Sequence, residues 1–236
     1  MGIKMNGTNL QNISWGTQLN PPTQISLLAW IDITSLSAPR VILEKYNTAG
    51  TRGLLFTAEG PTIPAIGWAE TASTANGYWL ADVTTGRHHV AVTMDRSSVN
   101  NNPKIYIDGV SQIVTEYNAP SGTFNTDSSD LWAIGDIVTD TNFKSFDGML
   151  YSLLVYDRIL SDEEIQQAYA TRLPLPIRKG LFFAPILWGC EGRQEFNGLT
   201  LTGTDLIYDP ISRTFGTPAG SPVGYGDELF MIGQIP

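Results

Sequence analysis

Short apolar runs that recur between turn residues constrain the fold of this chain most strongly. The chain holds 23 glycines and 14 prolines among its 236 residues, which suits frequent turns. Many short strands at such spacing are typical of an antiparallel sandwich or barrel. The runs expected to form strands span residues 25–33, 40–46, 53–59, 65–70, 77–83, 88–95, 104–109, 131–138 and 148–158.

One hairpin is marked by Asp108 and Gly109, since both residue types tolerate the positive φ angles of a type I′ turn. The apolar residues in "VSQIVTEY" (110–117) then predict the returning strand.

One helix is well specified near residue 161. Ser161 is the expected N-cap and Glu164 stands at N3, which makes a capping box. Leu160 and Ile165 occupy the positions of a hydrophobic staple. Pro174 prevents the helix from continuing much further.

The adjacent histidines of "HHVAVTMD" suggest a metal site at first sight. Neighbours in a strand point to opposite faces, so His88 and His89 cannot chelate one ion together. The chain has no third histidine, and Cys190 is its only cysteine, so a zinc site is not expected. His88 is interpreted as a hydrogen-bonded structural residue near the core and His89 as a strand-face residue. Asp108 is expected to make local turn hydrogen bonds.

Several of these segments together resemble the laminin-G-like domains of the concanavalin A-like lectin/glucanase superfamily. They are "IKMNGTNLQNISWG" with "QISLLAWIDI", "RHHVAVTMD…KIYIDG", and "FDGMLYSLLVYDRILSDEEIQQAY". The resemblance covers residues 1–170 and implies an all-β jelly-roll sandwich of two antiparallel sheets with one short helix. Arg87 stands where the family usually has a Trp, which concerns packing at the edge of the core rather than the fold.

Glycosidases of this superfamily resemble one another in a strand motif, E-x-D-x-x-E, that this chain lacks. We therefore expect a protein that is not an enzyme. In "GDIVTD", Asp136 and Asp140 share a strand face and are a weak calcium candidate, because calcium needs several hard oxygen ligands. A solvated strand end is the alternative reading, and no other cofactor is implied.

Aromatic side chains offer a possible ligand site, because sugars stack on their large rigid faces. Tyr78 and Trp79 in "NGYWLAD" are the glycan-stacking candidates. Core packing is the stronger interpretation for Trp79 and for Trp68, whereas Tyr78 points the other way and is the better exposed candidate.

Charge narrows the class of partner. The formal net charge is −9 without a basic cluster, so neither nucleic acid nor an anionic membrane surface is an expected partner. The longest apolar run, "GLFFAPILWGC", is too short to span a bilayer and contains Pro185. No signal peptide is recognised, so we expect a soluble product made in the cytosol or released by a route without a signal.

Residues 171–236 differ from the rest in being apolar and punctuated by Gly and Pro. They are interpreted as an irregular extension that packs on the first domain or anchors the protein to an assembly. The leading hypothesis is a non-catalytic virion protein, such as a phage capsid decoration protein made in the host cytoplasm, which binds capsid proteins and self-associates. The alternative is a carbohydrate-binding module or receptor-binding protein that binds a surface glycan. A glycan hydrolase is the least favoured reading.

Overall fold

The protein is described here from a computed structural model. The structure describes residues 3–7, 13–15, 20–46, 52–60, 62–125, 131–135, 144–171, 177, 179–183, 193–196, 199–203 and 207–208.

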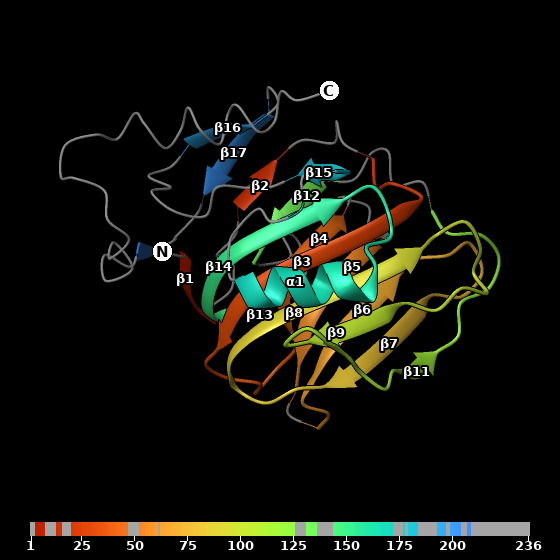
Figure 1. Cartoon of the computed structure of the whole chain (residues 1–236), viewed down its shortest axis with the longest axis horizontal. Coiled ribbons are helices and arrows are strands. Elements are labelled where there is room, and N and C mark those ends of the chain that lie inside the picture. Colours follow the sequence, from red (N-terminus) through yellow and green to blue (C-terminus); the bar gives the residue numbers. More distant parts are fainter. Residues whose placement is uncertain are drawn as a thin grey trace.

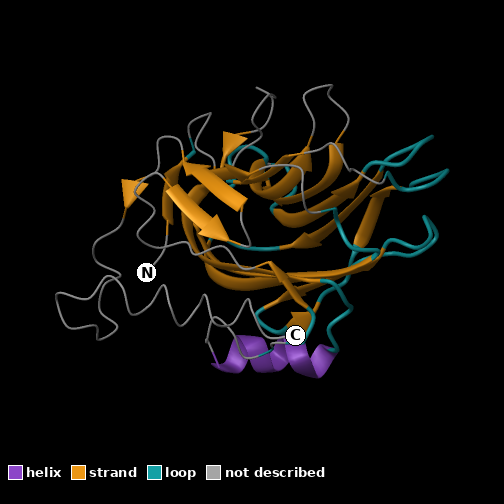
Figure 2. Cartoon of the chain, turned by 90° about the horizontal axis from the view of Figure 1, so that it is seen from above, coloured by secondary structure: helices purple, strands orange, loops and turns teal. Residues whose placement is uncertain are grey.

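Two β-sheets stack face to face, as the sequence predicts, and the one helix among the described residues lies outside one of them (Figures 1 and 2). The first, sheet A, runs in the order β10 (Val110–Ser111), β9 (Lys104–Ile107), β8 (Gly86–Asp95), β3 (Gln24–Ile33), β14 (Asp147–Tyr156), β1 (Ile3–Asn6) and β18 (Ile207–Tyr208), with β15 (Leu181–Phe183) also paired to β14.

The second, sheet B, runs in the order β11 (Thr115–Asn118), β7 (Gly77–Asp82), β6 (Ala65–Glu70), β5 (Arg52–Glu59), β4 (Arg40–Tyr46), β12 (Leu131–Ile134), β2 (Ile13–Trp15), β17 (Leu199–Gly203) and β16 (Arg193–Phe196). β13 (Lys144–Ser145) pairs with β4 in parallel, whereas the other pairings among the described strands are antiparallel. The all-β sandwich with one short helix is confirmed.

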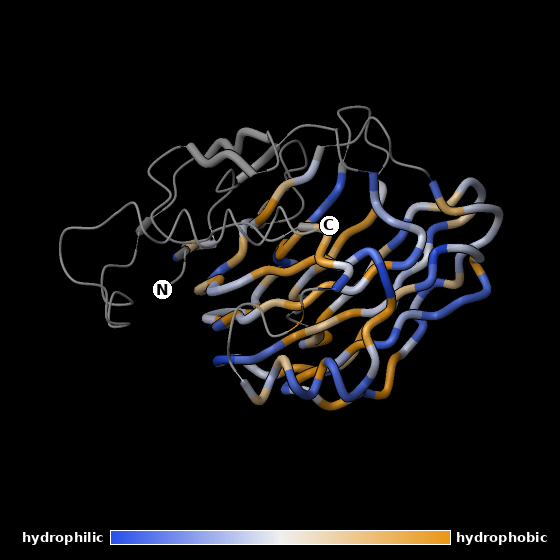
Figure 3. The backbone as a smooth tube through the Cα atoms, turned by 45° about the horizontal axis from the view of Figure 1, so that its top comes forward, coloured by the Kyte–Doolittle hydropathy of each residue, from blue (hydrophilic) through white to orange (hydrophobic). Residues whose placement is uncertain are grey.

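The core fills the space between the sheets because alternate residues of each strand point inward. Figure 3 shows apolar stretches along the strands and hydrophilic ones in many connecting loops. The largest inward side chains have 0–1% exposure, and they are Phe56, Trp68, Trp79, Trp132 and Phe146.

The helix α1 (Asp162–Thr171) covers part of the outer face of sheet A and closes a second apolar cluster there. Its capping box forms as predicted: Glu164 N donates to Ser161 Oγ (3.2 Å), and Ser161 N donates to Glu164 Oε2 (3.0 Å). Leu160 and Ile165, the predicted staple, are 1% and 0% exposed in this cluster.

The hairpin turn at Asp108-Gly109 is confirmed, with φ angles of 52° and 79°. The single returning strand predicted over residues 110–117 is wrong. Only β10 pairs with β9, after which the chain crosses to sheet B and β11 pairs with β7. Most of the apolar residues that suggested one strand do not face a core: Val110 is 60% and Ile113 92% exposed, and only Val114 packs against the core.

Described parts of residues 171–208 continue both sheets rather than standing apart. β15 extends sheet A beside β14, and β17 joins β2 in sheet B. The carbonyl of Ile177 accepts a hydrogen bond from Tyr156 Oη at 3.0 Å. Within the described residues, no helix has the length and apolar character needed to cross a membrane.

Candidate functional site

The histidine-rich stretch is held in place by one carboxylate. Asp108 Oδ2 lies 2.9 Å from His88 Nδ1, and Asp108 Oδ1 accepts a 2.9 Å hydrogen bond from His89 N. His88 is thus the hydrogen-bonded structural residue expected from its place in the strand. The carboxylate ties the β8 strand to the hairpin turn, which is a structural task.

His89 is buried under the helix, at 2% exposure, and is not on an open strand face. Its ring lies 5.3 Å from that of Trp30 and 6.0 Å from that of Tyr169, a helix residue. Burial lowers the pKa of His89 to about 4, although the charge of Asp108 acts in the opposite direction. This histidine is therefore neutral near pH 7.

Arg87, the residue that departs from the family pattern, lies on the same outer face of sheet A. Its guanidinium carbon is 4.3 Å from the ring centre of Tyr151 and 5.5 Å from that of Trp30. The arginine thus covers aromatic surface at the edge of the helix-covered cluster.

Metal ligands are not assembled in the described part of the chain, where no three His, Cys, Asp or Glu side chains come together. The calcium candidates Asp136 and Asp140 lie outside the described residues.

The outer face of sheet B carries an aromatic pair that spans two strands. Tyr78 on β7 and Tyr117 on β11 have ring centres 5.9 Å apart at an interplanar angle of 81°. Tyr117 is 60% exposed, whereas Tyr78 is only partly exposed. The edge-to-face contact fixes the ring of Tyr117 without covering it, so a flat apolar surface remains available to a ligand.

Beneath this pair, a carboxylate lies beside the Tyr78 phenol. Burial and then the negative charge of Glu59 hold the pKa of Tyr78 above its usual range, so the phenol stays protonated. Gly67 makes room for the arrangement, since a Cβ there would lie 2.5 Å from Thr57 Oγ1 and 3.2 Å from Glu59 Cγ. We call Thr57, Glu59, Tyr78 and Tyr117 the tyrosine patch.

Trp79, the second glycan candidate of the sequence, is 0% exposed and belongs to the main core. Its Nε1 donates to Asn102 Oδ1 and Glu116 Oε2, both at 3.2 Å. Its ring therefore offers no open face to a sugar, and Tyr78 is the member of the pair that reaches the surface. The sequence did not indicate Tyr117 as a ligand-binding candidate, because it predicted residues 110–117 as one strand beside residues 104–109, which lie in sheet A.

A family model described as the concanavalin A-like lectin/glucanases superfamily matches residues 6–166. A search of the curated proteins found no matching sequence.

Several solved structures share the fold at low identity. A heptameric SAP-like pentraxin from Limulus polyphemus is 14% identical, with a TM-score of 0.55 over 86% of this chain and 95% of that one. A putative carbohydrate-binding protein from Bacteroides ovatus is 15% identical, with a TM-score of 0.58 over 88% of this chain but only 60% of that one. The CBM40 module of the Ruminococcus gnavus IT-sialidase is 15% identical, with a TM-score of 0.52 over 71% of this chain and 96% of that one.

Proposed function

Because the chain belongs to the concanavalin A-like lectin/glucanases superfamily over residues 6–166, we propose that it is a non-catalytic glycan-binding protein. The proposal is supported by the solved structures that share its fold, which include a putative carbohydrate-binding protein and a CBM40 module. This was the alternative reading of the sequence, and the comparisons favour it over the virion reading.

The observation that carries the proposal is the exposed ring of Tyr117 beside Tyr78. Sugars present an apolar face of C–H groups and a rim of hydroxyls, so an aromatic surface next to fixed polar groups suits them. Tyr117 supplies the aromatic surface, and beside it the Tyr78 phenol is fixed in place by hydrogen bonds to the buried side chains of Glu59 and Thr57.

Glycoside hydrolysis is not favoured, because the chain lacks the E-x-D-x-x-E strand motif of the superfamily's glycosidases. Glu59 and Asp82 stand in the same row, each paired with Ala65 of the strand between them. The Glu59 side chain leans away from the row of Ala65 and Asp82, because its Cγ lies near Gly67, two residues further along β6. A glycosidase needs two carboxyl groups facing each other across the scissile bond, roughly 5–10 Å apart. Binding without cleavage is the function that we assign to the patch.

The test is a glycan array followed by calorimetric titration of the best ligand. Tyr117→Ala is expected to weaken binding of that ligand about fivefold, since a stacked aromatic contributes on the order of 1 kcal/mol. Ile113→Ala is the matched control, because it also removes an exposed apolar side chain from the same segment. If no glycan binds the wild-type protein, or if both variants bind as the wild type does, the proposal is wrong.

A second candidate function is assembly on a virion, with self-association. It is favoured by two exposed apolar side chains, Val110 and Ile113, which are 60% and 92% exposed. Val110 lies in β10, an end strand of sheet A, and Ile113 lies between β10 and β11, an end strand of sheet B. Exposed apolar residues of this kind are common where proteins meet a partner. Quantitative mass spectrometry of purified virus particles would test this role. A fixed copy number of the protein per particle supports it, and absence of the protein from the particles rules it out.

A further inference from the structure

A cavity lies at the end of the sandwich where β3 begins and β8 ends. This end of the two strands is at the right of Figure 1. We call it the rim pocket. Its volume is about 280 Å³. Three separate segments line it, and the lining residues are Asn20, Pro21, Thr23, Arg96, Phe124 and Asn125.

Main-chain hydrogen bonds hold these segments together. Arg96 N donates to Thr23 O at 2.7 Å, which joins the first segment to the second. Asn125 N donates to Thr71 O at 3.0 Å, and Arg96 Nη2 donates to Asn125 O at 3.0 Å. The pocket is therefore formed before any ligand arrives, and little loop ordering opposes binding.

A buried ion pair lies against the pocket. Arg96 Nε is 3.0 Å from both carboxylate oxygens of Glu70, and the two side chains are 5% and 0% exposed. The charge of the arginine is thus neutralised from within the protein. The pair also fixes the wall of the pocket, because the same guanidinium donates to Asn125 O.

The rest of the lining combines one aromatic ring with small polar groups. Phe124 is partly buried and packs against the main core, which fixes its ring. Asn20 and Asn125 offer amide side chains, and Thr23 offers a hydroxyl. Such groups both donate and accept, which suits the hydroxyls of a sugar, while the ring suits its apolar face.

We propose that the rim pocket is a second ligand site, which takes a single uncharged sugar unit at the end of a glycan. The inference rests on the proposed function for the class of ligand, but it concerns different residues from the tyrosine patch. Its volume, just under the roughly 300 Å³ at the lower limit of small-molecule sites, limits the ligand to about one sugar ring. The internal pairing of Arg96 with Glu70 favours a neutral sugar over an acidic one.

The test titrates the full-length protein with monosaccharides, monitored by ligand-observed NMR. The panel holds glucose, galactose, mannose and N-acetylglucosamine as neutral sugars and N-acetylneuraminate as the acidic one. At least one neutral sugar is expected to bind, with Kd raised about tenfold by Asn20→Ala and by Phe124→Ala. Asn20 is exposed, so its variant remains informative even if the loss of Phe124 disturbs folding. Ile113→Ala, at an exposed side chain that belongs to neither site, is the control and leaves monosaccharide affinity unchanged.

A charge variant adds a test of specificity. Glu70→Gln removes the negative charge that balances Arg96, so affinity for N-acetylneuraminate is expected to rise about tenfold relative to the wild type. The inference is overturned if no neutral monosaccharide binds, if Asn20→Ala and Phe124→Ala both bind as the wild type does, or if the wild type prefers the acidic sugar. Glycan-array binding that depends on Tyr117 alone would leave the proposed function standing and remove only the rim pocket.

Discussion

A neutral histidine buried beneath a helix makes the stability of this protein depend on pH. The pKa of His89 is about 4 in the folded protein, against 6.5 for an unperturbed histidine. Above pH 6.5 the folded and unfolded states are both neutral at this position. Between pH 6.5 and 4, His89 binds a proton in the unfolded state but stays neutral in the folded state. The unfolding free energy therefore falls by about 3 kcal/mol over this range.

The substitution His89→Leu is therefore expected to flatten the pH dependence of stability in this window. Urea unfolding at pH 7, 5.5 and 4.5 measures it, with the wild type as reference. Within the described residues, His89 Nδ1 has no hydrogen-bond partner that would stabilise a second proton. An unchanged slope in the variant would show that other groups cause the acid sensitivity.

The same residue shows how far the sequence predicts this molecule. Strand alternation separated His88 from His89 correctly, because neighbours in a strand must face opposite ways. It could not show that Tyr169, 80 positions later in the chain, would lie over His89. The rim pocket was missed for the same reason, since Asn20, Arg96 and Phe124 meet only through the pairing of distant strands.

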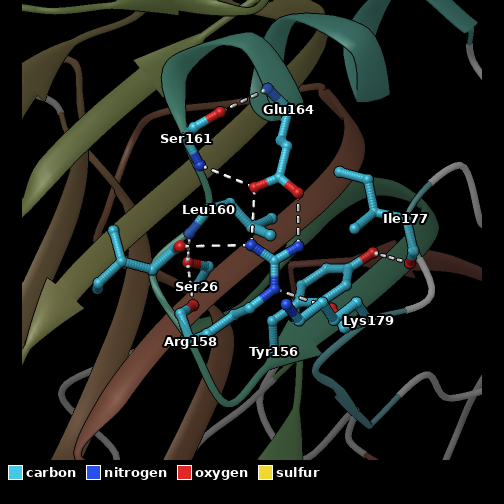
Figure 4. A network of polar contacts seen from close by, with 9 residues as sticks. Ser26, Tyr156, Arg158, Leu160, Ser161, Glu164, Ile177 and Lys179 are labelled. Atoms are coloured by element: carbon cyan, nitrogen blue, oxygen red, sulfur yellow. Dashed lines mark hydrogen bonds and ion pairs between the residues drawn. The ribbon is translucent and has the colours of Figure 1, made fainter.

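At the scale of elements, the capping box of α1 is also an anchor for the chain that precedes it (Figure 4). Glu164 accepts from Ser161 N and from both terminal nitrogens of Arg158, at 2.7 and 2.6 Å. Ser26 Oγ, on β3, donates to Arg158 O and accepts from Leu160 N. One carboxylate thus begins the helix and orients the loop that leads to it, and the Arg158 guanidinium lowers the pKa of Glu164.

Ser161→Ala is expected to lower the unfolding free energy by about 1 kcal/mol, which corresponds to about 2–4 °C in Tm for a chain of this size. The loss of one oxygen leaves Glu164 N without its cap. Gln166→Ala, on the exposed side of the helix, is the control and should leave Tm unchanged within about 1 °C. Equal melting of Ser161→Ala and the wild type in calorimetry would contradict the energetic role of the cap.

Strands whose apolar residues face a core were predicted correctly from the sequence, whereas the segment 110–117 was not. Strands at 40–46 and 65–70 agree with the structure because their apolar residues face a core. In residues 110–117 most apolar side chains are exposed and only Val114 packs against the core, so their pattern did not indicate the pairing, and the crossing between sheets was not foreseen.

At the scale of the whole molecule, residues 177–180 are part of the folded sandwich. Ile177 is 7% exposed in the cluster under α1. Arg158 Nε also donates to Lys179 O, and Asp157 N donates to Gly180 O, both at 2.9 Å. A boundary at residue 170, as expected from the sequence, would cut away these contacts.

We therefore expect a chain truncated after residue 183 to be more stable than one truncated after residue 171, by about 2 kcal/mol or more, since the longer chain keeps a buried isoleucine. Thermal unfolding of the two truncations measures the difference, and light scattering compares their masses with that of the intact chain. Identical Tm values would show that residues 172–183 add nothing to the fold. If both truncated chains keep the oligomeric mass of the intact chain, the residues after 171 are not the site of self-association.

Three of the six tryptophans of the chain, Trp68, Trp79 and Trp132, are buried, which has a practical consequence for optical assays. Indole emission depends on the polarity around the ring, and these three rings are shielded from solvent. A sugar that settles on Tyr117 or against Phe124 changes the surroundings of none of them directly. Their emission reports unfolding of the sandwich, so a fluorescence titration that shows no change is not evidence that ligand is unbound.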